Sequence, residues 1–337
     1  MTVLRSDKRL TDSPSILRGG HQLGPLIFFL LAMAVLVAVL VALRGPLPVA
    51  QTTINGLVTG AYFALGAAGL TLVFGILRLI NFAHGDLLTF GAYIALATVY
   101  LGLPFWVAVI ASVLITAATT LGFEAVIWDP LRRRGAGTLQ MILTAIGLAF
   151  ILRHGIQLIA GTNPQTLGVD VVSTFNVGPL TIGQTQAWVL IAGYLVLVLL
   201  GVMLRFSLLG KQLRALSDDL DLAEVTGIDS DRLILITQAL SGGLAGLAGI
   251  LFAASVGSIT PNVGFFLLIS LFSATILGGV GNAYGALVGG IALGLVQEWS
   301  TLVLDARWKT AIGFVVLVAM IIIRPTGLLG QKRLVDR

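Results

Sequence analysis

The longest stretch without a charged side chain, Leu233 to Gln297, constrains this chain more than any other feature. It covers 65 residues, whereas one membrane-spanning helix needs only about 20 apolar residues. Charged residues make up 10% of the whole chain, compared with roughly 25% in soluble domains. These observations predict an all-α fold, a polytopic membrane helical bundle.

The individual spans follow from cutting the uncharged runs at turn residues. The longest run breaks at "SITPNVG" (258–264) and "GGVGNAYG" (278–285), and "LGLP" (101–104) divides another run. The first span is a retained helix rather than a secretory signal, because "RGPLP" after it is not a small-x-small cleavage site. About 10 transmembrane helices result, or 8 to 9 if some segments are re-entrant. The predicted spans are 26–43, 50–77, 83–101, 104–127, 138–160, 186–206, three between 233 and 297, and 308–323.

The orientation follows from the distribution of Lys and Arg, which favour cytoplasmic loops. With the N-terminus inside, 15 of the 20 basic residues fall in cytoplasmic segments, and the loop 161–183 lies outside. Both termini are therefore expected in the cytoplasm. The expected division is a cytoplasmic tail at 1–25, a transmembrane domain at 26–323, and a cytoplasmic tail at 324–337.

Several chemistries are excluded by what the sequence lacks. It has no Cys, so it has no disulfides and no Cys-ligated metal. No G-x-x-x-x-G-K-[ST] motif is present, so no phosphate loop binds ATP. No H-E-x-x-H motif, G-x-S-x-G motif or other nucleophile–base set indicates an enzyme. The net charge of +5 is assigned to basic cytoplasmic loops rather than to nucleic-acid binding.

The cytoplasmic connection 207–231, "SLLGKQLRALSDDLDLAEVTGIDSD", differs from the other loops. It starts basic and becomes acidic, and its apolar residues recur at roughly helical spacing. Asp218 can cap a short amphipathic helix that Gly227 ends. The segment is either a solvated connection or a docking helix for a soluble partner. Its apolar positions are Leu213, Leu216, Leu220 and Val225.

The stretch "RLINFAHGDLLTFGAY" (78–93) places polar groups between two apolar regions. One interpretation is a tight cytoplasmic turn in which Arg78 snorkels and Asp86 caps a helix. The other is a helix broken inside the membrane, with its free backbone groups facing a transport path. "ILRLINFAHGDL" (76–87) is echoed by "ILGGVGNAYGAL" (276–287), which indicates a possible internal repeat.

Two further patterns concern helix packing. "SGGLAGLAG" (241–249) spaces glycines for close helix contact, which can serve contacts with a partner chain as well as the internal fold. Glu124 and Arg153 lie in predicted spans. They can pair across neighbouring spans, or lie near a membrane face where snorkelling or water satisfies them.

The motifs "NFAHGDLLTFGAY", "GKQLRAL…DLAEVTGID", "ILGGVGNAYGALVGG" and "RPTGLLG" together resemble the permease subunits of ATP-binding-cassette importers for branched-chain and other neutral amino acids. The resemblance is to the first of the two permeases of such systems and covers about residues 50–330. It implies a type II importer-like fold in the bacterial inner membrane. It also implies a second homologous permease, two cytosolic ATP-binding subunits and an external substrate-binding protein as partners, with ATP on the partner subunits and no cofactor on this chain.

Two alternative functions remain open. Urea permeases of the same family carry similar motifs, so urea is an alternative substrate. An ion-coupled secondary transporter using Asp86 and His84 is a second alternative, although such a carrier does not require the acidic 207–231 segment. No catalytic residue and no metal ligand is expected. The hypothesised translocation path comprises Asn81, His84, Gly85, Asp86, Gly281, Asn282, Tyr284 and Gly285. The hypothesised ATPase-coupling residues are Leu216, Leu220, Ala223, Glu224 and Gly227.

Overall fold

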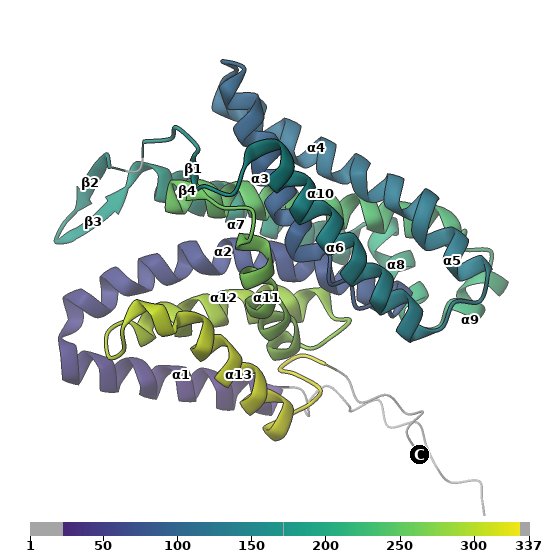
Figure 1. Cartoon of the computed structure of the whole chain (residues 1–337). Helices are drawn as coiled ribbons and strands as arrows, with labels where there is room; N and C mark the ends of the chain where they lie inside the picture. Colours follow the sequence, from purple (N-terminus) through teal and green to yellow (C-terminus); the bar gives the residue numbers. More distant parts are fainter. Residues whose placement is uncertain (1–22, 171, 331–337) are drawn as a thin grey trace, which may run out of the picture.

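The computed structural model describes residues 23–170 and 172–330, and almost all of its ordered elements are helices (Figure 1). Every segment predicted as a span is helical. The long helices are α1 (Leu23–Arg44), α2 (Pro46–Leu77), α3 (His84–Tyr100), α4 (Phe105–Phe123), α6 (Thr138–Ala160), α7 (Gln184–Phe206), α10 (Ser230–Val256), α11 (Val263–Gly278), α12 (Ala283–Ser300) and α13 (Lys309–Ile323).

Seven helices of the described residues are long and apolar enough to cross a membrane, so the chain is a multi-pass membrane protein. They are α1, α2, α4 continued through η1 (Glu124–Trp128) and α5 (Asp129–Arg133), α6, α7, α10, and α13 with η2 (Ala306–Trp308). The predicted count of ten also includes α3, α11 and α12, which are not among these seven helices. At 1.5 Å per residue, α3 and α11 are only about 25 Å long, less than the roughly 30 Å of a hydrocarbon core.

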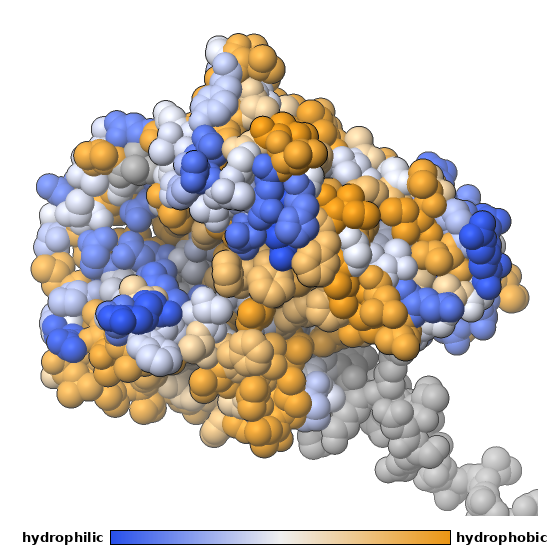
Figure 2. Space-filling view, in the orientation of Figure 1, coloured by the Kyte–Doolittle hydropathy of each residue, from blue (hydrophilic) through white to orange (hydrophobic). Residues whose placement is uncertain are grey.

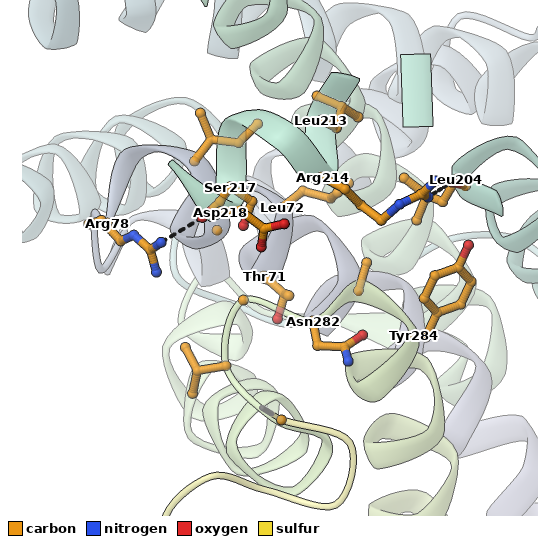
Figure 3. A pocket seen from close by; sticks show the side chains of 16 residues that line it. Thr71, Leu72, Arg78, Leu204, Leu213, Arg214, Ser217, Asp218, Asn282 and Tyr284 are labelled. Carbon is orange, nitrogen blue, oxygen red and sulfur yellow. Dashed lines mark hydrogen bonds between the residues drawn. The ribbon is translucent and has the colours of Figure 1, made fainter. Parts of the chain in front are cut away.

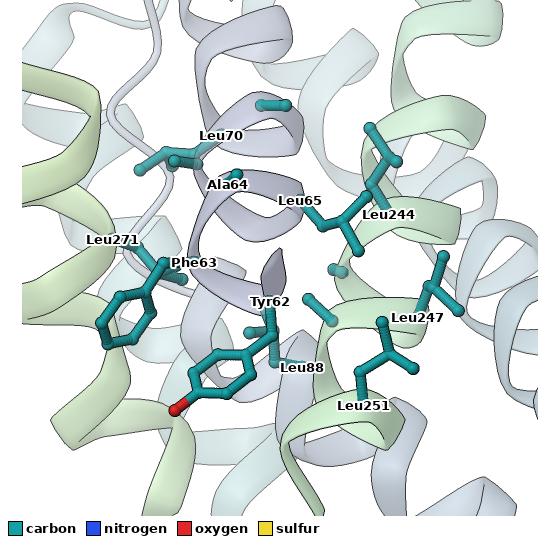
Figure 4. Packing of buried hydrophobic residues seen from close by; sticks show 14 of the residues in the cluster. Tyr62, Phe63, Ala64, Leu65, Leu70, Leu88, Leu244, Leu247, Leu251 and Leu271 are labelled. Carbon is teal, nitrogen blue, oxygen red and sulfur yellow. The ribbon is translucent and has the colours of Figure 1, made fainter. Parts of the chain in front are cut away.

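Helix α2 forms the centre of the bundle, with α10, α11 and α12 packed around it (Figure 4). Glycines bring α2 and α12 into backbone contact. A Cβ on Gly294 would lie 2.3 Å from the backbone nitrogen of Gly60, and one on Gly290 would lie 2.3 Å from the Cα of Ala64. Small residues at such crossings allow the two helices to approach closely. Close packing matters in a membrane, because in lipid the hydrophobic effect does not drive apolar helices together.

The glycine run at 241–249 packs α10 against its neighbours within this chain. A Cβ on Gly242 would lie 2.2 Å from Thr120 Oγ1, and one on Gly249 would lie 1.9 Å from the Leu88 carbonyl oxygen. The predicted close packing is therefore confirmed within this chain.

The 207–231 segment contains two short helices instead of the one expected. Helix α8 (Leu208–Asp218) is capped by Ser207, whose Oγ accepts from the Gly210 amide at 3.0 Å. Helix α9 (Leu220–Val225) is capped by Asp219, not by Asp218, through the Leu222 amide at 3.0 Å. The expected end at Gly227 is confirmed, because Gly227 adopts a φ of 86° that favours glycine.

The loop between α6 and α7 holds a small antiparallel hairpin, β2 (Thr174–Val177) paired with β3 (Leu180–Gly183). A second pair joins β1 (Gln165–Thr166) to β4 (Ser258–Ile259). The hairpin and helices α8 and α9 lie at opposite ends of the bundle, while α1 begins and α13 ends away from the hairpin (Figure 1). The predicted tails fall largely outside the described residues, including the basic residues Arg5, Lys8, Arg9, Arg18, Lys332, Arg333 and Arg337.

Candidate functional site

A six-residue break separates α2 from α3 and begins at Arg78. This residue ends α2 in the left-handed conformation, with φ 52° and its amide donating to the Phe74 carbonyl at 3.0 Å. Among the described residues other than glycine, Arg78 alone has a positive φ. Its exposed guanidinium donates through Nη2 to the Ser217 carbonyl at 2.7 Å, so the end of α2 is tied to the end of α8.

Two buried polar residues at this break form hydrogen bonds with backbone groups. Asn81 Oδ1 accepts from the Ala83 amide at 3.0 Å, as expected for a side chain beside an interrupted helix. His84 is fully buried, and its Nε2 lies 2.9 Å from the Gly66 carbonyl, so this nitrogen carries the proton and donates. These two side chains therefore stabilise the junction between α2 and α3.

Asp86 forms a buried ion pair with Arg153 of α6. Arg153 Nε and Nη2 each donate to one Asp86 oxygen at 2.9 Å, and the Asp86 side chain is 1% exposed. The guanidinium also lies over the rings of Phe265 at 4.6 Å and Phe150 at 5.6 Å. The expectation that Asp86 caps the start of α3 is therefore wrong, because its carboxylate is committed to a cation on another helix.

Glu124 does not pair with Arg153, so that expected alternative is also wrong. Its two oxygens accept from Arg132 and, at 2.8 Å, from Gln238 Nε2 of α10. Glu124 opens the π-helical turn η1, which lies between α4 and α5. Sequence reasoning did not identify Gln238, although a polar residue inside a 65-residue uncharged run is a signal that it has a partner.

Gly85 is required for packing rather than for backbone conformation. Its φ is not positive, and neither is that of Gly285, contrary to the expected use of both as conformationally free residues. A Cβ on Gly85 would lie 2.2 Å from the Gly264 carbonyl oxygen at the start of α11. Thr89 Oγ1 accepts from the Gly264 amide at 2.8 Å and completes this contact between α3 and α11.

The second break, between α11 and α12, has the irregular backbone that the sequence predicts. Gly279 and Gly281 have φ values of 115° and 82°. Asn282 Oδ1 accepts from the Gly285 amide at 3.1 Å, and its Nδ2 donates to the Leu329 carbonyl at 2.8 Å. The "RPTGLLG" tail therefore packs directly on this break.

A cavity of about 700 Å³ lies between this second break, the end of α2 and helix α8 (Figure 3). Gly281, Asn282 and Tyr284 line it, whereas Asn81, His84, Gly85 and Asp86 do not. The structure thus separates the two predicted path stretches instead of bringing them to one cavity. The sequence analysis did not assign to the site the polar lining residues Thr71, Arg78, Arg214, Ser217 and Asp218.

The residues expected to couple to an ATPase fall into two groups. Leu216 and Ala223 are 2% and 3% exposed and pack into the core, so neither offers a side chain to a partner, contrary to expectation. Leu220 is partly buried, and Glu224 is exposed and accepts from Ser230. The apolar side chains that α9 does expose are Leu222 at 63% and Val225 at 86%.

The comparisons with known proteins agree with this architecture. The family described as "Branched-chain amino acid transport system / permease component" matches residues 52–323. The high-affinity branched-chain amino acid transport system permease proteins BraD of Pseudomonas aeruginosa and LivH of Escherichia coli K12 are each 32% identical over 295 residues, covering 83% of this chain and 95% of theirs. The ribose import permease protein RbsC of Escherichia coli K12 is 26% identical over 276 residues, covering 80% of this chain and 84% of its own.

Among solved structures, PsaBC from Streptococcus pneumoniae in complex with Fab has a TM-score of 0.46 and 18% identity, covering 81% of this chain and 91% of that one. The family assignment rests on the sequence matches, which extend across all but the first of the membrane-spanning helices. This chain belongs to the branched-chain amino acid transport permease family.

Proposed function

We propose that this permease imports branched-chain or other neutral amino acids and obtains its energy from ATP hydrolysed on partner subunits. The observation that carries the proposal is the match to branched-chain amino acid permeases along nearly their whole length. The chain itself has no phosphate-binding loop motif. The proposed complex lies at the bacterial inner membrane. It contains a second homologous permease, two cytosolic ATP-binding subunits and an external substrate-binding protein.

The 207–231 segment is the proposed contact for the ATP-binding subunit. It lies at the end of the bundle opposite the β2–β3 hairpin, and α9 presents Leu222 and Val225 among acidic side chains. Exposed apolar residues bordered by charge are typical of protein interfaces. With both termini cytoplasmic, this end of the bundle faces the cytosol.

The cavity connects this proposed contact with the interior of the helical bundle. Helix α8 supplies Leu213, Arg214 and Ser217 to the cavity wall, and Ser217 accepts the hydrogen bond from Arg78. A movement of α8 would therefore change the cavity between α2 and the second break. Alternating access then requires ATP to favour one position of α8 over the other.

The rival functions find less support in the side-chain arrangement. An ion-coupled carrier using Asp86 would need that carboxylate to exchange a proton or cation, but Arg153 already holds it with two hydrogen bonds. His84 is buried and donates to a carbonyl, and it does not line the cavity described above. Urea differs from amino acids in lacking a carboxylate, and the relatives described above are named as branched-chain amino acid and ribose permeases.

Uptake measurements test the proposal. Cells lacking this chain and cells regaining it would be given labelled leucine, isoleucine, valine, alanine and urea. We expect restored uptake of the branched-chain amino acids, and loss of that uptake when the phosphate-loop lysine of the ATP-binding partner is replaced. Restored uptake of urea alone, or uptake that survives the loss of ATP hydrolysis, would contradict it.

A further inference from the structure

The exposed surface of α6 is not uniformly apolar. Figure 2 shows a hydrophilic patch on the viewed face where α6 runs in Figure 1, bordered by hydrophobic surface. Near the C-terminal end of α6, His154 Nδ1 lies 2.8 Å from Gln157 Oε1, and Gln157 Nε2 donates to Asn262 Oδ1 at 3.2 Å. Arg153 lies beside His154 on the same helix. These four residues form what we call the α6 polar stripe.

The stripe occupies one side of the helix. Residues 153, 154 and 157 lie on one side of the helix, because Gln157 is four residues after Arg153 and three residues after His154. Ile159, at the same height, lies on another side of the helix and is 88% exposed. Helix α6 therefore presents a lipid-compatible face and a polar face side by side.

The stripe also begins well before the C-terminal end of α6. Arg153 is seven residues before the last residue of α6, which corresponds to about 10 Å along the axis. Helix α6 has 23 residues and is among the helices able to cross a membrane. Polar side chains at such depth are costly against lipid, and they normally face protein or a water-filled space.

The inward-facing contacts of Arg153 do not remove this cost. Arg153 is neutralised by Asp86 and covered by Phe265, and its side chain is 11% exposed. His154 and Asn262, however, remain exposed, although the ring of Phe150 stacks on the imidazole of His154 at 5.9 Å. Their hydrogen bonds leave further donors and acceptors directed away from the chain. Hydrocarbon cannot satisfy those groups, whereas water and a polar solute can.

We propose that the α6 polar stripe lines the translocation path of the assembled importer, in the half of the membrane nearer the β2–β3 hairpin. The inference rests on the proposed function and identifies the wall that substrate passes. The ion pair has no net charge, and the imidazole and amides supply both donors and acceptors. That chemistry suits a small zwitterion with no net charge, such as a neutral amino acid, better than an anion or a cation.

Single cysteines test the proposal, because the chain contains none. His154→Cys and Gln157→Cys would be compared with the matched variant Ile159→Cys in the complete transporter in membranes. The probe is a membrane-impermeant maleimide added from outside, with Asn163→Cys in the exposed loop as the positive control. Because maleimide reacts with the water-exposed thiolate, labelling at 154 and 157 should be about tenfold faster than at 159.

A second measurement separates a path from a merely wet surface. Trapping the ATP-binding subunits with ATP and vanadate should change the labelling rate at 154 and 157, while Asn163→Cys stays constant. Equal labelling at positions 154, 157 and 159, no labelling at any of them, or rates that do not change with nucleotide would each overturn the proposal. Labelling of 154 and 157 only when the second permease is omitted would overturn it too, because the stripe would then be a subunit interface. Loss of amino acid uptake by the unmodified chain would instead refute the proposed function.

Discussion

Asp86 and Arg153 form a buried charged pair in the membrane-spanning region. Their two hydrogen bonds join α3 to α6, and the carboxylate is almost completely buried. Removing one partner of such a pair leaves an uncompensated charge, which costs about 3–5 kcal/mol, whereas removing both can cost much less. We therefore expect Arg153→Ala to destabilise the chain more than the double variant Asp86→Ala/Arg153→Ala does.

Thermal unfolding of the purified complex in detergent, followed by the recovery of folded protein, measures this difference. A double-mutant cycle then isolates the interaction of the two side chains. If the single variant Arg153→Ala were as stable as the double variant, the ion pair would not stabilise the packing of α3 on α6.

Gly85 gives a second prediction at the level of one residue. A methyl group there meets the Gly264 backbone, which cannot move aside without separating α3 from α11. Gly85→Ala should therefore reduce folded protein and transport strongly. Gly147→Ala is the matched control on α6, where an added Cβ meets nothing within 4 Å.

Alanine favours a helix over glycine by about 1 kcal/mol, so Gly147→Ala should be neutral or stabilising. Membrane yield and uptake rate distinguish the two variants. Equal tolerance at both positions would show that the contact between Gly85 and Gly264 is not needed. Sequence reasoning identified Gly85 correctly as special, but it attributed the requirement to backbone φ, since contacts between distant segments are not visible in a local pattern.

At the scale of elements, the exposed apolar residues of α9 mark the proposed contact with the ATP-binding subunit. Leu222→Asn should weaken association with the ATP-binding subunit, because this side chain is 63% exposed at the proposed contact. Leu208→Asn at the start of α8 is the matched control, since Leu208 is 71% exposed but lies outside α9. Copurification of the ATP-binding subunit and the rate of ATP hydrolysis are the measurements.

Ala223→Arg is not a suitable test of docking, because Ala223 is 3% exposed and a large charged side chain there would disturb the core. Undiminished copurification by Leu222→Asn, or equal losses for both variants, would argue against α9 as the contact. The difference between Ala223 and Leu222 is a matter of which side of a short helix faces the bundle.

The helices themselves follow from the sequence more readily than their contacts do. Long uncharged runs and their Gly, Pro and Asn breaks place each helix to within a few residues, because the membrane requires backbone hydrogen bonds to be satisfied within each span. The sequence does not show that the chain between Ser207 and Gly227 forms two helices, since either Asp218 or Asp219 can cap. It also does not show which acid pairs with Arg153, because that choice depends on how α3, α4 and α6 pack.

At the scale of the whole molecule, the cavity links the coupling segment to the second helix break. Tyr284 lines the cavity, and its hydroxyl donates to the Gly201 carbonyl at 3.3 Å. Ala286, two residues along α12, is fully buried. A thiol at position 284 should therefore meet water from the cytoplasm, while a thiol at position 286 should not.

The last prediction uses this contrast to test orientation and coupling together. Tyr284→Cys should react with an impermeant maleimide only after the membrane is opened, and Ala286→Cys should remain unreactive. Because α8 forms part of the cavity wall, a nucleotide analogue bound to the partner subunits should change the rate at 284. Labelling of Tyr284→Cys in sealed cells would reverse the proposed orientation. A rate at 284 that is insensitive to nucleotide, in a complex that still hydrolyses ATP, would show that movement of α8 is not transmitted to the cavity.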